Sequence, residues 1–206
     1  MNDEALTPER ILEAAEDVLR RYGPAKATVV DVARALGVSH GSVYRHFASK
    51  AVLRDAVVER WLARSGTPLA RIAADKGKAS ERLRRWFDTL IAGKREKALG
   101  DTELFATYYA LTADAREIVK AYGDARFAEI EAMVAEGVAS GEFRRVDAKA
   151  TAAALWNATT RFYNPAHSSE WLQPGIDAAF DDLWKLLMHG LLAPPHQDFE
   201  STRSRA

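Results

Sequence analysis

Apolar side chains recur along this chain at the three- and four-residue spacing of amphipathic helices, beginning with the first patterned segment. In that segment Thr7 and Pro8 are typical of a helix N-terminus, and Gly23 and Pro24 of its end. The apolar stripe between them consists of Ile11, Ala14, Ala15, Val18, Leu19 and Tyr22. No segment alternates apolar and polar residues as a half-buried strand does. The pattern therefore predicts an all-α protein whose first helix buries one face.

Residues 28–50 predict two short helices joined by a tight turn. Thr28 followed by Asp31 fits an N-terminal capping box, and the apolar stripe of the first helix follows directly. Gly37 is expected to end that helix in the left-handed conformation, and Ser39 to cap the second helix. Two helices joined in this way have the spacing of a helix-turn-helix, whose second helix lies in the major groove of DNA.

The rest of the chain is expected to be helical as well. A helix capped by Ser49 is expected to stop within residues 65–68, where Ser, Gly, Thr and Pro follow one another, and a short helix around Ile72 comes next. Later helices are expected near residues 80–91, 104–111, 114–140, 147–164 and 176–192. We therefore predict a three-helix DNA-binding domain at 1–66, a helical domain at 67–193, and a flexible tail at 194–206.

Charge is balanced over the whole chain but not over the predicted helix-turn-helix. The chain has 29 basic and 29 acidic residues, yet no acid lies between Asp31 and Asp55. The cations of this window are Arg34, Arg45, Lys50 and Arg54. A basic, acid-free stretch favours contact with the phosphate backbone of DNA, although an ordinary helical pair on a solvated surface has the same local pattern.

Several classes of protein are disfavoured by what the sequence lacks. The absence of cysteine excludes disulfides and thiolate metal sites. The five histidines lack the spacing of a helical metal site, so we expect no metal and no cofactor. No apolar run approaches the ~18 residues that span a bilayer, and the polar N-terminus is unlike a signal peptide. We expect a cytoplasmic protein without a membrane partner.

Over residues 7–60 the chain resembles the N-terminal domain of tetracycline-repressor-like (TetR family) transcriptional regulators. The residues that carry the resemblance are Thr28, Asp31, Val32, Ala33, Leu36, Gly37, Val38, Ser39, Gly41, Ser42, Tyr44, His46, Phe47, Ser49, Lys50 and Leu53. Beyond residue 60 the resemblance extends to length, the all-helical pattern and two amphipathic C-terminal helices. His40 stands where a lysine or arginine is frequent in the family, and Ala51 replaces the acid that usually follows the lysine.

The resemblance implies a DNA-binding site centred on the second helix of the motif. The residues that it assigns to DNA are Thr28, Ser39, His40, Gly41, Ser42, Tyr44, Arg45, His46 and Lys50. In the family pattern the first turns of this helix read base edges, whereas Ser39, His46 and Lys50 lie at phosphates together with the helix start at Thr28. Arg45 faces solvent by helical phase and is expected to contact a phosphate or a guanine.

The resemblance also implies a cavity for a small-molecule effector in the C-terminal domain. Aromatic residues from several helices are the candidate lining: Trp86, Phe105, Tyr108, Tyr109, Phe127, Trp156 and Phe162. Because they dominate the candidate lining, we expect a mainly apolar or aromatic effector, with Arg161 as one available charge. For any single one of these residues, packing in a filled core is the alternative interpretation.

The helices near 147–164 and 176–192 are expected to pair two copies of the chain. The first of them is apolar almost all round, more than one core can cover, and two helices per subunit form a four-helix interface. The leading hypothesis is a homodimeric repressor released from a palindromic operator by its effector. The alternatives are a DNA-binding architectural protein without an effector and a helical-bundle enzyme. The enzyme is disfavoured because the aromatic region holds no acid, base or nucleophile pair.

Overall fold

The computed structural model describes residues 5–194, and every regular element in that range is a helix, which confirms the predicted all-α class. The helices are α1 (Pro8–Lys26), α2 (Val29–Leu36), α3 (His40–Tyr44), α4 (Lys50–Ala73), α5 (Ala79–Gly100), α6 (Thr102–Asp114), α7 (Arg116–Ala139), α8 (Ala148–Ala158), α9 (Thr160–Tyr163), the 3-10 helix η1 (Pro165–Glu170) and α10 (Ile176–Leu191). The tail predicted at 194–206 lies, from residue 195 on, outside the described residues.

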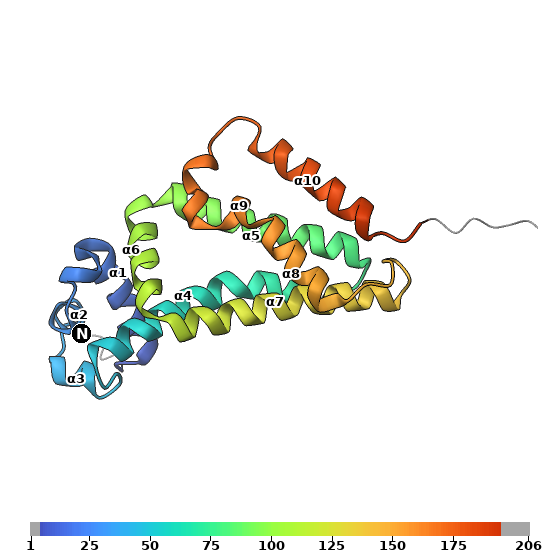
Figure 1. The fold of residues 1–206 in the computed structure, drawn as a ribbon. Coiled ribbons are helices and arrows are strands. Elements are labelled where there is room, and N and C mark those ends of the chain that lie inside the picture. The colour runs from blue at the N-terminus through green and yellow to red at the C-terminus, as the bar shows by residue number, and fades with distance from the viewer. Residues whose placement is uncertain (1–4, 195–206) are drawn as a thin grey trace, which may run out of the picture.

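An N-terminal core joins α1, α2, α3 and the first half of α4 at one end of the molecule (Figure 1). Ile11, Val43 and Val57 are fully buried in it. The break predicted at Gly23 and Pro24 is present as a kink inside α1, where Gly23 adopts a φ of 72°. Tyr22 was predicted to share the buried stripe, and this is wrong: at the last turn before the break its ring is 44% exposed, near the guanidinium of Arg21.

The long helix α4 corrects one prediction. Instead of stopping at residues 65–68, it runs unbroken from Lys50 to Ala73, and the short helix expected around Ile72 is its last turn. The hydroxyls of Ser65 and Thr67 donate to carbonyls four residues earlier, at 2.9 Å each, so they are engaged within this helix and do not cap a new one. The buried Gly66 faces α7, whose packing holds the helix together.

A C-terminal core gathers side chains from the end of α4 and from α5, α7, α8, α9 and α10. Trp86 and Phe87 of α5 are fully buried at its centre, and Trp184 of α10 packs on Phe87 with 5.7 Å between ring centroids. The segment predicted as one helix over 147–164 is divided at Thr159 into α8 and α9. Asp147 caps α8 as expected, its carboxylate accepting from the amide of Ala150 at 2.6 Å.

Helix α6 crosses between the N-terminal end and the remaining helices (Figure 1). It packs against α1, α4 and α5, and its Tyr108 stacks on Trp61 of α4 with 4.6 Å between centroids. Tyr108 and Leu111 therefore belong to the N-terminal core although they lie far along the chain. Residue 66, the predicted domain boundary, lies inside α4, and both cores share that helix.

Candidate DNA-recognition surface and effector region

The ends of α2 and α3 are formed by contacts between near neighbours in the sequence. The hydroxyl of Thr28 accepts from the amide of Asp31 at 3.2 Å, while the Asp31 carboxylate accepts from the amide of Thr28 at 3.1 Å. Gly37 ends α2 with a φ of 68°, and Ser39 caps α3 by accepting from the amide of Ser42 at 3.2 Å. The predicted capping box, left-handed glycine and second cap are all confirmed.

The electrostatics of the capping box follow from its hydrogen bonds. The Thr28 hydroxyl donates to the Asp31 carboxylate at 2.6 Å, and the guanidinium of Arg34 lies 3.0 Å from the same group. These contacts, the Thr28 hydroxyl first, lower the pKa of Asp31 below its ordinary value. The carboxylate therefore stays ionised at the N-terminus of α2, where it balances the helix dipole.

Helix α3 presents most of its side chains to solvent. Val43 alone is buried among the five residues of α3, whereas His40, Gly41 and Tyr44 are exposed. Tyr44 is 42% exposed, and its ring meets that of His40 edge-on with 6.3 Å between the ring centroids. A Cβ added to Gly41 would meet only ordinary contacts within the protein, so internal packing does not require glycine there. The exposed face thus has no structural task within the described residues.

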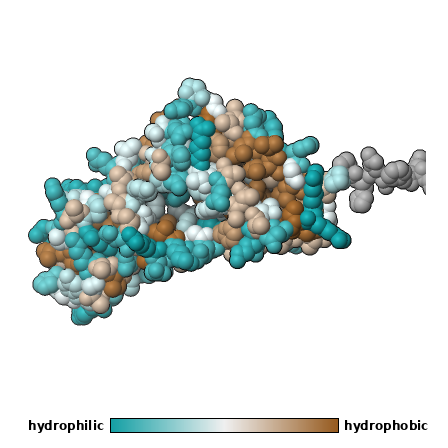
Figure 2. Space-filling model, viewed as in Figure 1, coloured by the Kyte–Doolittle hydropathy of each residue, from teal (hydrophilic) through white to brown (hydrophobic). Residues whose placement is uncertain are grey.

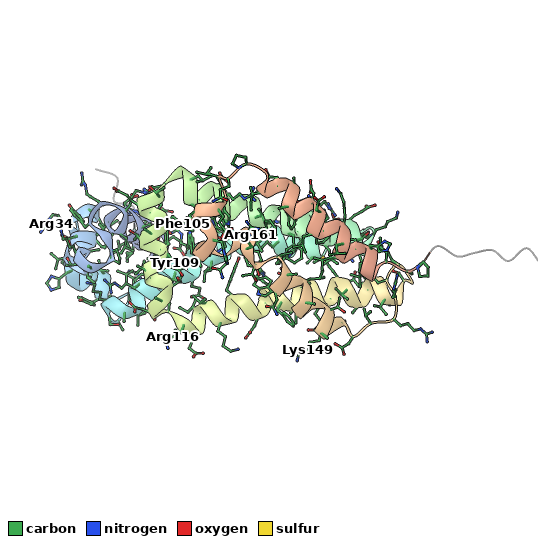
Figure 3. The ribbon with its side chains drawn as sticks, turned by 45° about the horizontal axis from the view of Figure 1, so that its top comes forward. Arg34, Phe105, Tyr109, Arg116, Lys149 and Arg161 are labelled. Carbon is green, nitrogen blue, oxygen red and sulfur yellow. The ribbon has the colours of Figure 1, made fainter. Side chains whose placement is uncertain are left out.

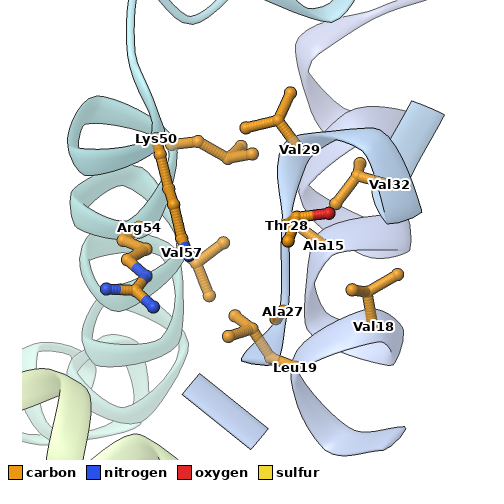
Figure 4. Close-up of a pocket in the computed structure, with 11 residues that line it drawn as sticks. Ala15, Val18, Leu19, Ala27, Thr28, Val29, Val32, Lys50, Arg54 and Val57 are labelled. Carbon is orange, nitrogen blue, oxygen red and sulfur yellow. The ribbon is translucent and has the colours of Figure 1, made fainter. Parts of the chain in front are cut away.

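The residues expected at phosphates lie on the rim of α3. Lys50, at the start of α4, lines a small void together with Thr28 and Val29 from the N-terminal end of α2 (Figure 4). His46 is exposed, and the guanidinium of Arg45 donates to the hydroxyl of Ser42 at 3.1 Å. The hydroxyl of Ser39 is already engaged, since it caps α3 and lies 3.0 Å from the Ser42 hydroxyl. The DNA roles of these residues stay predictions.

Arg54, counted in the basic window, turns away from this surface. Its guanidinium donates to the carbonyl of Pro24, which ties α4 to the end of α1. Beside it lies a void of about 20 Å³ among apolar side chains of α1, α2 and α4 (Figure 4). That volume holds about one water molecule, so the void is a packing defect rather than an effector site.

The aromatic residues predicted to line an effector cavity are divided between the two cores. Trp86 and Phe162 are buried in the C-terminal core, and Phe127 and Trp156 pack half-buried against it. Tyr108 lies in the N-terminal core.

The other two residues of that candidate lining lie on α6. Phe105 is half-buried and Tyr109 is 54% exposed (Figure 3). The structure therefore does not bring the seven predicted residues together. Arg161, the predicted charge, pairs with Glu170 at 2.7 Å and is half-exposed.

Sequence reasoning missed a cavity of about 400 Å³ between α4, α5 and α7. Arg64, Lys94 and Lys97 line it together with Tyr122. The two lysines lie in a charged stretch that resembles a solvated helix face, GKREKALG. Their three-residue spacing was the available signal, but only the packing of α4 against α5 turns them inward.

Neither a metal-binding group of side chains nor a membrane-spanning helix is present in residues 5–194. No three side chains among the His, Asp and Glu of this range are grouped as a metal site would need. None of its helices combines the length and apolar content that a bilayer crossing requires.

A helix-turn-helix carried on an all-helical C-terminal part defines the class of helical DNA-binding regulators. The family model described as "Bacterial regulatory proteins, tetR family" matches residues 11–57. The model "Tetracyclin repressor-like, C-terminal domain" matches residues 79–184, more than half of the chain. The chain belongs to the TetR family of regulators.

Individual relatives agree with this membership. An uncharacterized HTH-type transcriptional regulator of Mycobacterium tuberculosis is 37% identical over 78 residues; the match spans 38% of this chain and 39% of that regulator. SmeT, the repressor of the Stenotrophomonas maltophilia multidrug efflux pump SmeDEF, shares the fold with a TM-score of 0.68 and 21% identity over 92% of each chain. A TetR/AcrR-family regulator of Thermobifida fusca has a TM-score of 0.62 and 23% identity, covering 89% of this chain and 97% of that one.

Proposed function

We propose that the protein is a homodimeric repressor that binds a palindromic duplex operator in the cytoplasm and is released by a small effector. The observation that carries the proposal is the exposed face of α3, where Tyr44 is 42% exposed and its ring contacts that of the exposed His40. An aromatic ring beside exposed His40 and Gly41 at the start of a recognition helix suits contact with base edges in the major groove. The side-chain roles given above for residues 28–50 are part of this proposal.

Affinity for DNA would come mainly from the rim of that face. Lys50 and Thr28, at the N-terminus of α2, line the same small void, and Arg45 and His46 directly follow α3. Each cation that neutralises a phosphate contributes about one unit to the salt dependence of binding but no sequence preference. Removing such a cation should weaken all sequences alike, whereas removing a base-reading group should weaken the operator most.

The dimer would form through α8 and α10. An apolar area extends over the part of the molecule where these helices lie (Figures 1 and 2). Leu186 of α10 is 69% exposed, and α8 leaves Ala150, Ala154 and Ala158 exposed at helical spacing. Trp184 of α10 is instead buried against Phe87 within its own subunit. A second copy would cover the exposed apolar face with two-fold symmetry.

The effector would act by favouring one separation of the two recognition helices. A ligand that binds both arrangements equally shifts nothing, so its affinity must differ between them. A coupling of roughly 1–3 kcal/mol would weaken operator binding about 5- to 150-fold. The effector is proposed to be mainly apolar or aromatic, since Pro68, Leu90 and Tyr122 line the cavity between α4, α5 and α7.

The experiment begins with selection of bound duplexes from a random pool, followed by binding measurements over a series of salt concentrations. On the selected duplex, Tyr44→Ala should reduce affinity at least tenfold, and on a shuffled duplex much less. Lys50→Ala should weaken both duplexes similarly and lower the salt slope by about 1. Tyr22→Ala and Lys120→Ala are matched controls, because both side chains are exposed outside the motif.

The outcomes separate the alternatives. If Tyr44→Ala and Lys50→Ala bind both duplexes like the wild type at every salt concentration, α3 is not the recognition helix. If selection yields no preferred sequence while binding stays salt-dependent, the protein is an architectural DNA binder. A helical-bundle enzyme has no specific observation in its favour.

A further inference from the structure

Three long helices enclose the missed cavity. Helices α4, α5 and α7 lie side by side in the middle of the molecule (Figure 1), and the cavity of about 400 Å³ opens between them. Arg64, Ser65 and Pro68 contribute from α4, and Tyr122 from α7. Helix α5 contributes the rest, including Leu90, Lys94 and Lys97. Its volume lies within the range of sites for small organic ligands.

The polar end of this cavity carries an excess of positive charge. Lys94 and Lys97 both lie over the ring of Trp61, at 5.6 and 5.2 Å from its centroid. Among the described residues neither ammonium group forms an ion pair with a carboxylate, and Glu96 is the only acid in the lining. Burial, and then the charge of Lys97, lower the pKa of Lys94 to about 8. An ammonium that burial destabilises in this way gains from a bound anion.

Two groups of the cavity lining retain hydrogen-bonding capacity for a ligand. The ammonium group of Lys97 donates to the hydroxyl of Ser65, which leaves two of its three N–H donors. The hydroxyl of Tyr122 is buried and has no hydrogen-bond partner within the described residues. An unpaired buried hydroxyl costs free energy, so a ligand oxygen placed beside it would stabilise the complex.

The remaining wall of the cavity is apolar. Pro68, Leu90 and the ring of Tyr122 line it, with the small residues Ala92 and Gly93 beside them. A fully hydrated inorganic anion would leave this wall without a partner. An organic acid satisfies both ends, since its carboxylate faces the lysines and its hydrocarbon part covers the apolar wall.

We propose that this cavity binds a small amphipathic carboxylate, with its charged end between Lys94 and Lys97 and its apolar part against Pro68, Leu90 and Tyr122. This proposal narrows the chemical class of the effector. It rests on the proposed repressor function only where it concerns the ligand's effect on DNA binding. The contacts of Arg64 supply the route for that effect. Its guanidinium pairs with Glu16 of α1 at 2.6 Å and also lines the cavity, so a bound carboxylate competes with Glu16 for it.

That competition acts on the helix that carries the recognition motif. Arg60 also joins α4 to α1, through Glu13 at 2.9 Å. Loosening the Arg64–Glu16 pair removes one of these links and lets α1 and the motif tilt relative to α4. A ligand that binds better to the tilted arrangement thereby lowers affinity for the operator.

The test uses the purified dimer without DNA and isothermal titration calorimetry with benzoate, octanoate, benzyl alcohol, 1-octanol and inorganic phosphate. At least one carboxylate should bind at millimolar concentration or better, and its neutral alcohol at least tenfold more weakly. Lys94→Met and Lys97→Met should each weaken the carboxylate tenfold or more. Lys120→Met, an exposed lysine on α7 that pairs with Asp124, should leave its affinity unchanged.

The results of this titration decide whether the cavity binds a carboxylate. Lys94→Met relieves a buried charge, so it should fold at least as stably as the wild type, and loss of binding in it cannot be blamed on unfolding. Alcohols that bind as well as the acids, phosphate that binds best, an absence of carboxylate binding, or unchanged affinity in Lys94→Met would each overturn the proposal. Because this titration contains no DNA, its result is independent of the operator experiment. If a carboxylate binds but the protein prefers no operator sequence, the carboxylate site stands and the proposed repressor function is refuted.

Discussion

Replacing Gly137 with alanine probes the packing that holds the proposed dimer helices in position. Gly137 is buried in α7, and the ring of Phe143 lies directly on its backbone. A Cβ added there would overlap Cδ2 and Cε2 of that ring and lie 2.9 Å from Cγ. Phe143 in turn precedes α8 and forms an isolated bridge with Leu192, just after α10. Displacing the ring therefore disturbs the start of α8 and the end of α10 together.

Two opposing effects set the size of the change. Carbon atoms in contact prefer about 3.5–4.0 Å, so the ring must retreat by at least about 0.6 Å at Cγ and further at its edge. Strain of this kind costs about 1–3 kcal/mol in a packed core. Alanine gains about 1 kcal/mol over glycine in a helix interior. The expected net loss for Gly137→Ala is about 0–2 kcal/mol.

The same helix contains a matched control. A Cβ on Gly123 would meet nothing within 4 Å. Gly123→Ala should therefore show only the higher helix propensity of alanine and stabilise the protein by up to about 1 kcal/mol. Urea unfolding at equal protein concentration measures both variants. Phe143→Leu in the Gly137→Ala background should recover part of the loss, because the smaller side chain clears the new methyl group. If Gly137→Ala stabilised the protein as much as Gly123→Ala, the close approach of Phe143 would be refuted.

The remaining predictions concern the recognition motif and the dimer. Thr28→Ala should lower the free energy of unfolding in urea by about 1 kcal/mol at neutral pH, and Thr28→Ser should stay near the wild type. An unchanged free energy of unfolding in Thr28→Ala would refute the stabilising role of this cap. Because the pKa of Asp31 is lowered in the folded protein, its ionised form stabilises the fold above the ordinary pKa of 3.8 and is lost as pH falls below it. Asp31→Asn should thus lose stability at pH 7, and its deficit relative to wild type should shrink progressively as pH falls below 3.8; a deficit that does not change with falling pH would contradict this. Leu186→Glu should raise the dimer dissociation constant at least tenfold, as measured by sedimentation. Leu99→Glu is the control, because Leu99 is exposed at the end of α5, and it should leave that constant unchanged. A monomeric wild type would exclude the interface.

The sequence alone determined the features that depend on residues within about four positions of one another. The capping box of Thr28 and Asp31, the left-handed Gly37 and the cap at Ser39 were all predictable, because the interacting atoms belong to one turn of chain. The exposed face of α3 followed from the same turn, since Val43 is the position that helical phase directs inward. The all-α class was equally predictable from the three- and four-residue spacing.

Tertiary packing decided what distant residues do to one another. Residues 65–68 read locally as a helix stop, but packing on Tyr122 and Arg126 of α7 keeps α4 continuous. Tyr108 looked like its aromatic neighbours in sequence, yet stacking on Trp61 assigns it to the N-terminal core. An apolar side chain avoids water, but its residue type does not show which partner covers it. Residues that fill a core and residues that line a cavity therefore look alike in the sequence.

The same limit explains the missed cationic cavity. Lys94 and Lys97 belong to a charged stretch that by itself favours a solvated helix face. They turn inward only because Trp61 and Ser65 of α4, some thirty residues earlier in the chain, lie against that face of α5. Whether a charge faces water or a cavity depends on the neighbouring helix, and that is information a single segment does not contain.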